Sequence, residues 1–406
     1  MINLETPRKF RGFIDQANKV ADNFLRANSR KYDLAEHTYP KELDMLASLV
    51  DGMSDSGQGQ GAGATGVRRD DADSSEREGK VKNGTNMSSL LSIIEMCWGD
   101  VGLLLTMPRQ GLGNSAIASV ATEDQLARYK GTWAAMAITE SSTGSDSGAI
   151  TTTATKDGEY YVLNGEKIFV TSGDRADSVV VWATLDKKLG RAAIKSFLVT
   201  KNTPGIRVER LEHKLGIRAS DTAVIVLDNC RVHESNLLGN PDVDPKEGFA
   251  GAMATFDNTR PLVAGMAVGC ARASLELIRE LLEGAGTEID YDKPIQAQSY
   301  AAATFIAMEA DWEAALLLTM EAAWLADNRK PNSMQASMAK AKAGRVGNDI
   351  TLRCVELAGT LGYSEMSLLE KWSRDSKILD IFEGTQQIQQ LIVARRLLNL
   401  SSSELR

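Results

Sequence analysis

Apolar side chains recur three and four positions apart in two early sections of the chain, residues 6–50 and 87–129. This spacing lines up one face of an α-helix, so both sections are predicted to be helical. In the first section, the positions predicted to face a core are Phe10, Phe13, Ile14, Ala17, Val20 and Phe24. In the second section, TEDQ at 122–125 predicts a helix start, because Thr and Gln three residues apart suit a capping box.

The spacing changes at about residue 134. Between 134 and 239, short runs rich in Val, Ile, Thr and Tyr alternate with Gly, Asn and Asp, which predicts β-strands joined by turns. Asn164-Gly165 stands between two such runs and predicts a β-hairpin, because this pair tolerates the positive backbone angles of a tight primed turn. From 248 onwards, long apolar helices are predicted at 249–283, 297–326, 333–359 and 387–400.

Residues 51–86 differ in composition from the helical sections on either side. Gly, Ser, Asp and Arg dominate, with GQGQGAG at 57–63, so this segment is too polar to build a core and is predicted to be a mobile surface loop. It does not match a phosphate-binding loop, because no strand precedes it and no Lys-Ser/Thr closes it. The predicted domains are therefore a helical domain at 1–133, a β domain at 134–247 and a helical bundle at 248–406.

The composition is that of a globular protein. Its 406 residues are 43% hydrophobic, enough for a large core divided among two or three packed units. The net charge is −8 and no basic cluster occurs, so nucleic acid is not an expected partner. The four cysteines lie far apart and only three histidines accompany them, which predicts neither a disulfide framework nor a metal site. No apolar stretch has the length of a signal sequence or the roughly 20 residues that cross a bilayer, so we expect a cytoplasmic protein without a membrane span.

Short polar side chains open the β domain at 137–146, AITESSTGSD. Such a loop lets backbone amides and hydroxyls approach a ring system and bond its polar edge, although a plain polar turn would look the same. Further segments follow: NGEKIFVTSG at 164–173, HKLGIRASDT at 213–222, NLLG at 236–239, FDNTRP at 256–261 and RDSKILDIFEGTQQIQ at 374–389. In this order and spacing, the segments resemble the acyl-CoA dehydrogenase family of flavoproteins.

The resemblance implies an α+β multidomain fold, with an N-terminal helical domain, a middle antiparallel β-barrel or sandwich, and a C-terminal four-helix bundle. It implies FAD as the cofactor and an acyl-CoA thioester as the substrate. The implied reaction is α,β-dehydrogenation to a trans-2-enoyl-CoA, and electron-transfer flavoprotein is the implied acceptor. Acyl chain length is not specified by any of these segments.

The resemblance also gives roles to individual residues. Glu383 is the implied catalytic base, which removes the proton next to the thioester carbonyl, and Gly384 allows the close approach of substrate. Flavin contacts are implied for Ile138, Thr139, Ser145, Phe169, Thr171, Thr385 and Gln387. Substrate contacts are implied for Ser145, Asp257, Arg260 and Gly384.

Three of these positions carry alternatives. Phe169 stands where the family usually has Trp, which keeps a flat packing surface and loses the indole donor. Arg260 either meets the adenine or phosphate end of CoA or pairs with Asp257, and the two roles are compatible. Some relatives carry the base at the position of Thr259, which cannot act as a base, so Glu383 is the sole candidate.

The chain departs from the family where relatives hold the adenine half of FAD. An RxxFG motif is absent from 282–294, LEGAGTEIDYDKP, whose acidic side chains would repel a pyrophosphate. A QxxGG motif is replaced by ELAGT at 356–360. These losses predict an α2β2 assembly in which a paralogous subunit supplies the adenosine half. The alternative is a homotetramer in which other residues, for example Gln298 or Lys293, take the place of the missing motifs.

Other functions fit the same fold. An acyl-CoA oxidase or a flavin monooxygenase differs in whether reduced flavin meets oxygen, although the chain is shorter than the longer oxidases and such monooxygenases typically lack the glutamate. A non-catalytic scaffold subunit is a further alternative, against which the intact Glu383, Thr139, Ser145 and Thr171 argue. Bulky ring-bearing acyl groups remain open as substrates by analogy only.

Overall fold

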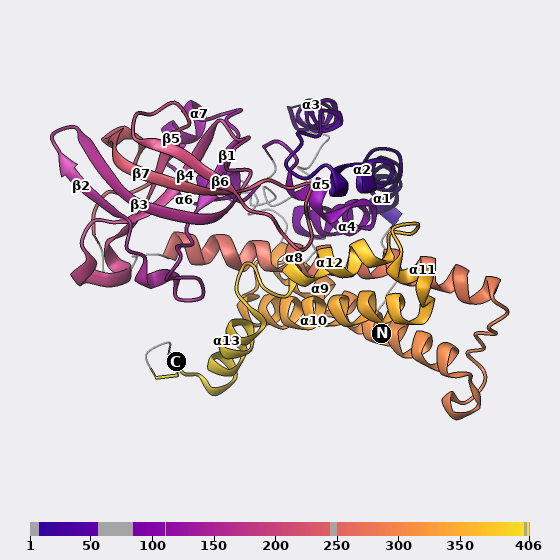
Figure 1. Ribbon diagram of the computed structural model, residues 1–406. Helices are drawn as coiled ribbons and strands as arrows, with labels where there is room; N and C mark the ends of the chain where they lie inside the picture. Colours follow the sequence, from indigo (N-terminus) through magenta and orange to yellow (C-terminus); the bar gives the residue numbers. More distant parts are fainter. Residues whose placement is uncertain (1–7, 56–83, 110, 244–249, 402–403, 406) are drawn as a thin grey trace.

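The computed structural model describes residues 8–55, 84–109, 111–243, 250–401 and 404–405, and side chains at 49–55 and 250–258 are outside this description. In sequence, helices precede and follow a section of β-strands, and in space the strands lie to one side, beside the N-terminal helices and above the C-terminal helices (Figure 1). The N-terminal helices are α1 Arg8–Val20, the π-helical η1 Ala21–Arg26, α2 Ala27–Leu34, α3 Glu42–Asp55, α4 Thr85–Gly99 and α5 Val101–Leu105.

The predicted N-terminal helices are present, but fewer of their side chains reach the core than expected. Phe10 is 5% exposed, whereas Phe13 is 37% exposed and lies on the outer side of α1. The reason is that α1 packs mainly on α4, at the edge of the molecule. The bounds predicted for a loop at 51–86 overlap helix at both ends, because α3 continues to Asp55 and α4 begins at Thr85. The rest of that prediction falls on residues 56–83, which lie outside the described residues.

The start of α4 is fixed from a distant part of the chain. The Asp327 carboxylate, at the end of α9 (Tyr300–Asp327), accepts hydrogen bonds from the backbone amides of Asn86 at 2.9 Å and Met87 at 3.0 Å. A carboxylate in this place satisfies amides that have no partner within the helix and opposes the helix dipole. The other predicted helix start is local and is confirmed: Thr122 and Gln125 form a capping box at α7 (Glu123–Arg128).

Seven strands form one curled sheet in the order β1-β4-β2-β3-β7-β6, with β5 paired to β4. The sheet is antiparallel except where β4 runs parallel to β1 and, at one residue pair, to β2. A helix preceding the sheet, α6 (Leu112–Val120), packs on one face of it through Ala116 and Ile117. The strands are β1 Ala134–Ala137, β2 Thr153–Asp157, β3 Tyr160–Thr171, β4 Ser178–Thr184, β5 Ile194–Thr200, β6 Ile206–Leu211 and β7 Thr222–His233.

The hairpin predicted at Asn164-Gly165 is wrong. Strand β3 passes straight through both residues, and its pairing with β7 shifts register between Leu163 and Gly165, as at a β-bulge. The turn between β2 and β3 instead contains Gly158, whose φ is +59°. Gly165 is required there for space, since a Cβ would lie 2.4 Å from Thr152 Oγ1.

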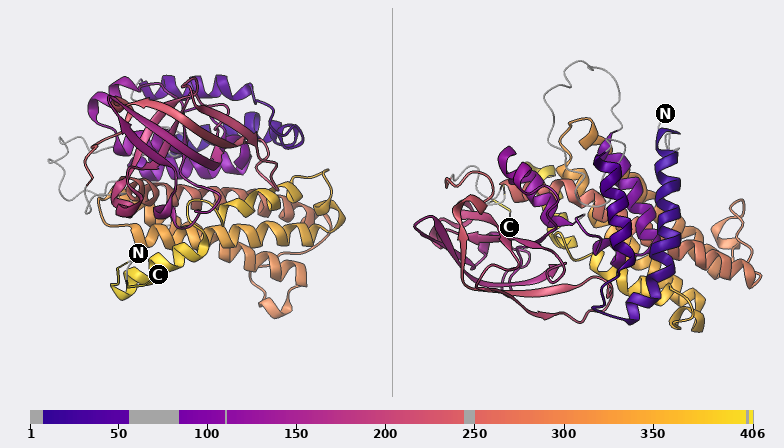
Figure 2. Two further views of the ribbon diagram at one scale, coloured as in Figure 1. Left: turned by 60° about the vertical axis from the view of Figure 1, so that its left-hand side comes forward. Right: turned by 90° about the horizontal axis from the view of Figure 1, so that it is seen from above.

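The C-terminal helices cross beneath the N-terminal helices and the sheet (Figure 2). Four of them, α8, α9, α10 and α12, pack against one another, as predicted for a bundle, and α12 was not predicted as a separate helix. Their bounds are α8 Ala250–Gly284, α9 as given above, α10 Ser333–Ala358, α11 Thr360–Tyr363, α12 Leu369–Leu379 and α13 Gln386–Leu398.

Helices from the two ends of the chain share one hydrophobic core. At the crossing of α4 and α8 the backbones are so close that a Cβ on Gly269 would lie 2.2 Å from the Ile94 carbonyl oxygen. Residues 259–284 of α8 are long and apolar enough to cross a membrane by length and composition, but 83% of the apolar window is buried. Core packing therefore accounts for the apolar character of this helix.

A buried charge network joins all three sections of the chain. The Lys371 ammonium on α12 lies 2.6 Å from Asp100 and also pairs with Asp375 one turn further on. The other oxygen of Asp375 accepts a hydrogen bond from the backbone amide of Ile217 at 2.5 Å, in the loop between β6 and β7. Two carboxylates around one fully buried ammonium raise the pKa of Lys371, against the effect of burial. The network holds the loop after β6 against α12, the helix that precedes Glu383 in the chain.

Candidate active site

The two β-domain segments assigned to flavin lie side by side. The backbone amide of Ile168 donates to the Thr139 carbonyl at 2.9 Å, which places Ile138 and Thr139 next to Phe169. Lys167 reinforces this junction, because its ammonium donates to the Ile138 carbonyl at 3.0 Å. Segments about thirty residues apart in sequence are thereby joined into one surface by backbone bonds.

Behind this surface lies a buried ion pair, Glu140–Lys167, that sequence inspection missed. Its nitrogen and nearest oxygen are 2.8 Å apart, and Lys167 is 0% exposed. Burial alone would raise the pKa of Glu140, but Lys167 and the hydroxyls of Thr151 and Thr152 lower it to about 2. Burial lowers the pKa of Lys167 to about 8 in spite of Glu140, because the ammonium has fewer bonding partners than the carboxylate. The available sequence signal was a Lys within the apolar alternation of a strand.

Phe169 has the features of a residue that faces a bound group. The residue is 61% exposed, and its φ of +57° is unusual for a bulky residue. The register shift between Lys167 and Val170 shows that a bulge at this point turns the side chain outwards. Thr171, two residues on, and Thr139 are half-buried, so both are partly accessible beside Phe169.

The loop at 140–146 also offers polar groups to a ligand. The Thr143 hydroxyl is buried and, among the described residues, has no hydrogen-bond partner. An unpartnered buried hydroxyl is costly, so a polar ligand edge beside it would be stabilising. Ser145 is exposed in the same loop. An exposed flat side chain, nearby threonines and an unpartnered buried hydroxyl fit the isoalloxazine half of a flavin.

Glu383 lies in a strained turn between α12 and α13. Its φ is +53° and that of Gly384 is +95°, and left-handed backbone is unfavourable for any residue with a Cβ. Thr259 on α8 donates its hydroxyl to Glu383 Oε2 at 2.5 Å. Burial raises the pKa of Glu383 above its usual value, while Thr259, Lys340 and Arg260 act to lower it. The chain thus places a carboxylic acid of raised pKa beside the position that Thr259 occupies.

Lys340 and Gln389 hold the same turn, and neither was predicted. Lys340 is 1% exposed on α10, and its ammonium donates to the Gly384 carbonyl at 2.7 Å. Gln389 is 0% exposed on α13 and donates to the carbonyls of Glu383 at 3.1 Å and Gly384 at 3.2 Å. A signal for Lys340 was present in the sequence, because it falls on the small-residue face of its helix with Ala336, Ala343 and Gly347.

The remaining predicted residues lie around this turn or outside the description. Arg260 is 5% exposed, and its charge acts on both Glu383 and Lys340, so it belongs to the Glu383 cluster. Thr385 caps α13, and Gln387 is exposed on the first turn of that helix. Asp257 lies on α8, but its side chain is outside the described residues, so pairing with Arg260 stays a prediction.

The two residues named as local substitutes for the adenine-side motifs are engaged in their own loop. Lys293 pairs with Glu288 at 2.9 Å and Asp290 at 3.4 Å. Gln298 donates to the backbone carbonyls of Asp290 and Lys293. Neither side chain is therefore free to turn towards a pyrophosphate without breaking these bonds.

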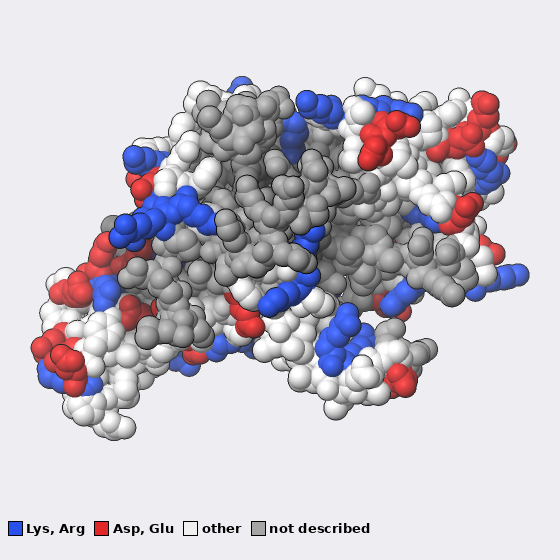
Figure 3. Space-filling model, turned by 180° about the vertical axis from the view of Figure 1, so that it is seen from behind, with Lys and Arg blue, Asp and Glu red and all other residues white. Residues whose placement is uncertain are grey.

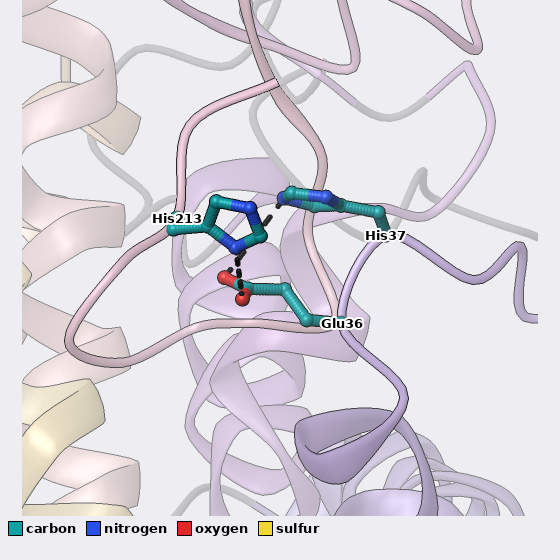
Figure 4. Close-up of side chains that lie close together, drawn as sticks. All are labelled: Glu36, His37 and His213. Carbon is teal, nitrogen blue, oxygen red and sulfur yellow. Dashed lines mark hydrogen bonds and ion pairs between the residues drawn. The ribbon is translucent and has the colours of Figure 1, made fainter. Parts of the chain in front are cut away.

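A second cluster of titratable groups, Glu36, His37 and His213, lies where the end of α2 meets the loop after β6 (Figure 4). Glu36 accepts hydrogen bonds from His213 Nδ1 at 2.8 Å and from the Lys214 amide at 3.0 Å, and His37 Nε2 bonds the Glu212 carbonyl at 3.1 Å. Each potential ligand atom thus already has a partner within the protein. The cluster is explained as a contact between the N-terminal helices and the sheet.

Two family models match the chain. The acyl-CoA dehydrogenase middle domain matches residues 135–230, and the acyl-CoA dehydrogenase C-terminal domain matches residues 246–398. The CarC subunit of the caffeyl-CoA reductase-Etf complex of Acetobacterium woodii is 34% identical over 324 residues, which make up 78% of this chain and 83% of CarC. The chain belongs to the acyl-CoA dehydrogenase family.

Other relatives agree with this assignment. Mouse mitochondrial short-chain specific acyl-CoA dehydrogenase is 37% identical over 262 residues, and the match spans 64% of this chain but only 62% of that relative. The solved structure of butyryl-CoA dehydrogenase from Megasphaera elsdenii superposes with a TM-score of 0.81 at 29% identity, covering 98% of this chain and 100% of the other. The acyl-CoA dehydrogenase fold predicted from the sequence is thereby confirmed.

Proposed function

We propose that this chain is an FAD-dependent acyl-CoA dehydrogenase that converts an acyl-CoA thioester to a trans-2-enoyl-CoA, with Glu383 as the base. The observation that carries the proposal is the Glu383 turn, in which a carboxylate of raised pKa is held in left-handed backbone beside Thr259. Strained backbone and a shifted pKa together are typical of a catalytic group rather than a structural one.

The reaction removes a proton and a hydride from neighbouring carbons. FAD, when bound, supplies the acceptor for the hydride from the β-carbon. Glu383 takes the α-proton, and its raised pKa makes it a stronger base than an ordinary carboxylate once ionised. Gly384 follows the base directly. Because it has no Cβ, it would let a thioester approach the backbone of the turn closely.

The same base serves the reverse direction. Protonated Glu383 would return a proton to the α-carbon of an enoyl thioester, and a raised pKa keeps part of the population protonated at higher pH. The 34% identity to a subunit named for caffeyl-CoA reduction supports this second candidate function. Enoyl-CoA reduction and acyl-CoA oxidation then differ in the potential of the partner that exchanges electrons with the flavin.

The purified protein with FAD tests this proposal. Anaerobic mixing with a panel of saturated and unsaturated acyl-CoA thioesters is followed by flavin absorbance. Saturated thioesters are expected to bleach the flavin, and E383Q is expected to lose that reaction by about 10⁴-fold while it still binds the thioester. Near wild-type bleaching by E383Q would overturn the role of Glu383.

For the assembly, we propose a heteromer in which a paralogous subunit holds the adenosine half of FAD. The engagement of Lys293 and Gln298 within their own loop supports this arrangement over local substitution. FAD content of the chain purified alone is compared with that of a co-expressed complex. A homotetramer that carries one FAD per chain would contradict the heteromer.

We propose electron-transfer flavoprotein as the redox partner. The name of CarC, which places it in a complex with Etf, supports this choice. On the face seen in Figure 3, Lys and Arg side chains are interspersed with Asp and Glu in the described part. Reduction of added electron-transfer flavoprotein, at a rate that depends on acyl-CoA, is the measurement.

A further inference from the structure

Lys340 is a buried cation that the proposed reaction does not use. It is 1% exposed, between the small side chains of Ala336 and Ala343 on the inner face of α10. Burial of an ammonium is unfavourable unless hydrogen bonds and opposite charges compensate it. Among the described residues, the hydrogen bond of Lys340 goes to one acceptor, the Gly384 carbonyl at 2.7 Å.

That acceptor lies directly after the proposed base. Glu383 and Gly384 both have left-handed backbone, at φ of +53° and +95°. A left-handed Glu is unfavourable by about 1–2 kcal/mol, so the turn persists only where surrounding groups hold it. Lys340 from α10 and Gln389 from α13 do so, because both donate to carbonyls of this turn.

The charge of Lys340 also reaches the carboxylate of Glu383. The charged groups that face Lys340 are Glu383 in the turn, Asp380 at the end of α12 and Arg260 on α8. Asp380 is itself near Lys377 at 3.4 Å, whereas the cations that act on Glu383 are Lys340 and Arg260. Burial lowers the pKa of Lys340 to about 8, against the effect of the two acids, so the amine remains mostly charged at neutral pH.

We propose that Lys340 is a positioning residue for the proton transfer: it fixes the Glu383-Gly384 turn through the Gly384 carbonyl, and its charge favours the ionised carboxylate without bonding it. A direct hydrogen bond from the ammonium would stabilise the carboxylate and weaken it as a base. Contact through the neighbouring carbonyl avoids that effect while it keeps the turn in place. This inference rests on the proposed function, because it assigns Lys340 to the same proton transfer.

Substitutions on α10 separate this role from a general structural one. K340M removes the donor and the charge with little change in volume, and K340R restores both. Lys342, on the same helix, is the matched control, because it is partly exposed to solvent and its ammonium lies 2.6 Å from Asp311 on α9 instead of bonding the turn. All variants are prepared as the full chain with FAD, in the assembly in which the wild type is active.

Kinetics provide the first readout. K340M is expected to lower the rate of flavin reduction by about 10²-fold with little change in KM for the thioester. The reason is that the variant displaces the base, Glu383, and leaves the binding of the thioester unchanged. The acid limb of kcat/KM should move to higher pH, since loss of a nearby positive charge raises the pKa of the base. K340R should recover most of the rate, and K342M should match the wild type.

Infrared titration provides a readout that does not depend on activity. The band of the protonated Glu383 carboxyl is identified by its absence in E383Q, and its midpoint should move to higher pH in K340M. An unshifted midpoint together with wild-type kinetics in K340M overturns the role of Lys340. If E383Q instead keeps flavin reduction, the proposed base is wrong, and the infrared midpoint still decides whether Lys340 acts on Glu383.

Failure of K340M to fold leaves the test intact. K340Q, which retains a neutral donor, and K340R then carry both readouts. The proposal requires K340R to resemble the wild type and K340Q to show the shifted limb and midpoint. Equal behaviour of K340Q, K340R and the wild type overturns it.

Discussion

Two glutamates of this protein each lie near a buried lysine, and their surroundings lead to opposite protonation behaviour. Glu140 accepts hydrogen bonds from the amides and hydroxyls of Thr151 and Thr152 and from Lys167 at 2.8 Å. Its pKa falls to about 2. Glu383 accepts a hydrogen bond from the Thr259 hydroxyl, while Lys340 donates to the neighbouring Gly384 carbonyl. Burial raises the pKa of Glu383.

The difference is one of hydrogen bonds to the charged form. A carboxylate that is saturated with donors stays ionised and unreactive, whereas one that is buried with few donors binds a proton readily. Glu140 therefore suits a structural role behind the Thr139–Phe169 surface, and Glu383 suits proton transfer. The two Glu–Lys combinations therefore suit different roles. Lys167 donates directly to the Glu140 carboxylate, whereas Lys340 donates to a backbone carbonyl beside Glu383.

The largest effect is expected from removal of the charge on Glu140. E140Q leaves the Lys167 ammonium buried without its carboxylate, which should destabilise the protein by about 3–5 kcal/mol. Urea unfolding monitored by circular dichroism measures the loss. The double variant E140Q/K167M is the control, because removing both charges should recover part of the stability. A loss below about 1 kcal/mol in E140Q would show that the pair is not needed.

The next effect is on folding stability, to which Glu140 and Glu383 contribute with opposite dependence on pH. The folded pKa of Glu140 lies below its usual 4.5, so its contribution is present above pH 4.5 and is lost as the pH falls towards about 2. The folded pKa of Glu383 is raised, so its contribution is present below the unfolded pKa and is lost as the pH rises through the folded value. Thermal unfolding at pH 7 should therefore show E383Q to be more stable than the wild type, whereas lower stability of E383Q would contradict this account.

A smaller effect is expected at the donor to Glu383. T259V removes the hydroxyl that bonds Oε2 at 2.5 Å, which should weaken the ionised form by about 1.5–3 kcal/mol. The acid limb of the pH profile for flavin reduction should then move to higher pH. T259S keeps the hydroxyl and should leave the limb in place. Equal profiles for T259V and T259S would show that the hydroxyl does not act on Glu383.

The smallest effect concerns the backbone of the turn. G384A places a Cβ at a φ of +95° and 2.5 Å from Gln389 Nε2, which should cost about 1–2 kcal/mol and reduce turnover. G12A, on the exposed side of α1 where nothing lies within 4 Å, is the control and should be neutral or slightly stabilising. Calorimetric unfolding of both variants gives the comparison.

Sequence reading succeeded where the signal was local and periodic. The long helices α8, α9, α10 and α13 begin and end within a few residues of the predicted bounds, because their apolar faces repeat over many turns. It failed at Asn164-Gly165, where a hairpin dipeptide lies inside a strand. Pairing with β7 and the space taken by Thr152 decide that conformation, and neither is visible along the chain.

The candidate site shows the same division. Glu383, Gly384 and Phe169 were predicted from segments that resemble a family, whereas Lys340 stands outside these segments and Gln389, at the end of segment 374–389, was given no role. Their roles depend on the carbonyls of the Glu383-Gly384 turn, to which both side chains donate. Glu140 lies in the 137–146 segment and Lys167 in the 164–173 segment, but their pairing becomes apparent only when β3 lies against the loop.

The sequence by itself determined the order of helical and β sections, the family and the acid proposed as base, because periodicity and short motifs are properties of the chain. The tertiary structure decided how each buried charge behaves. A carboxylate's pKa depends on the donors and charges within a few ångströms, and those around Glu140 and Glu383 come from distant segments. Only the packed helices show that Lys340 supports the turn of Glu383 through the Gly384 carbonyl instead of neutralising its carboxylate directly.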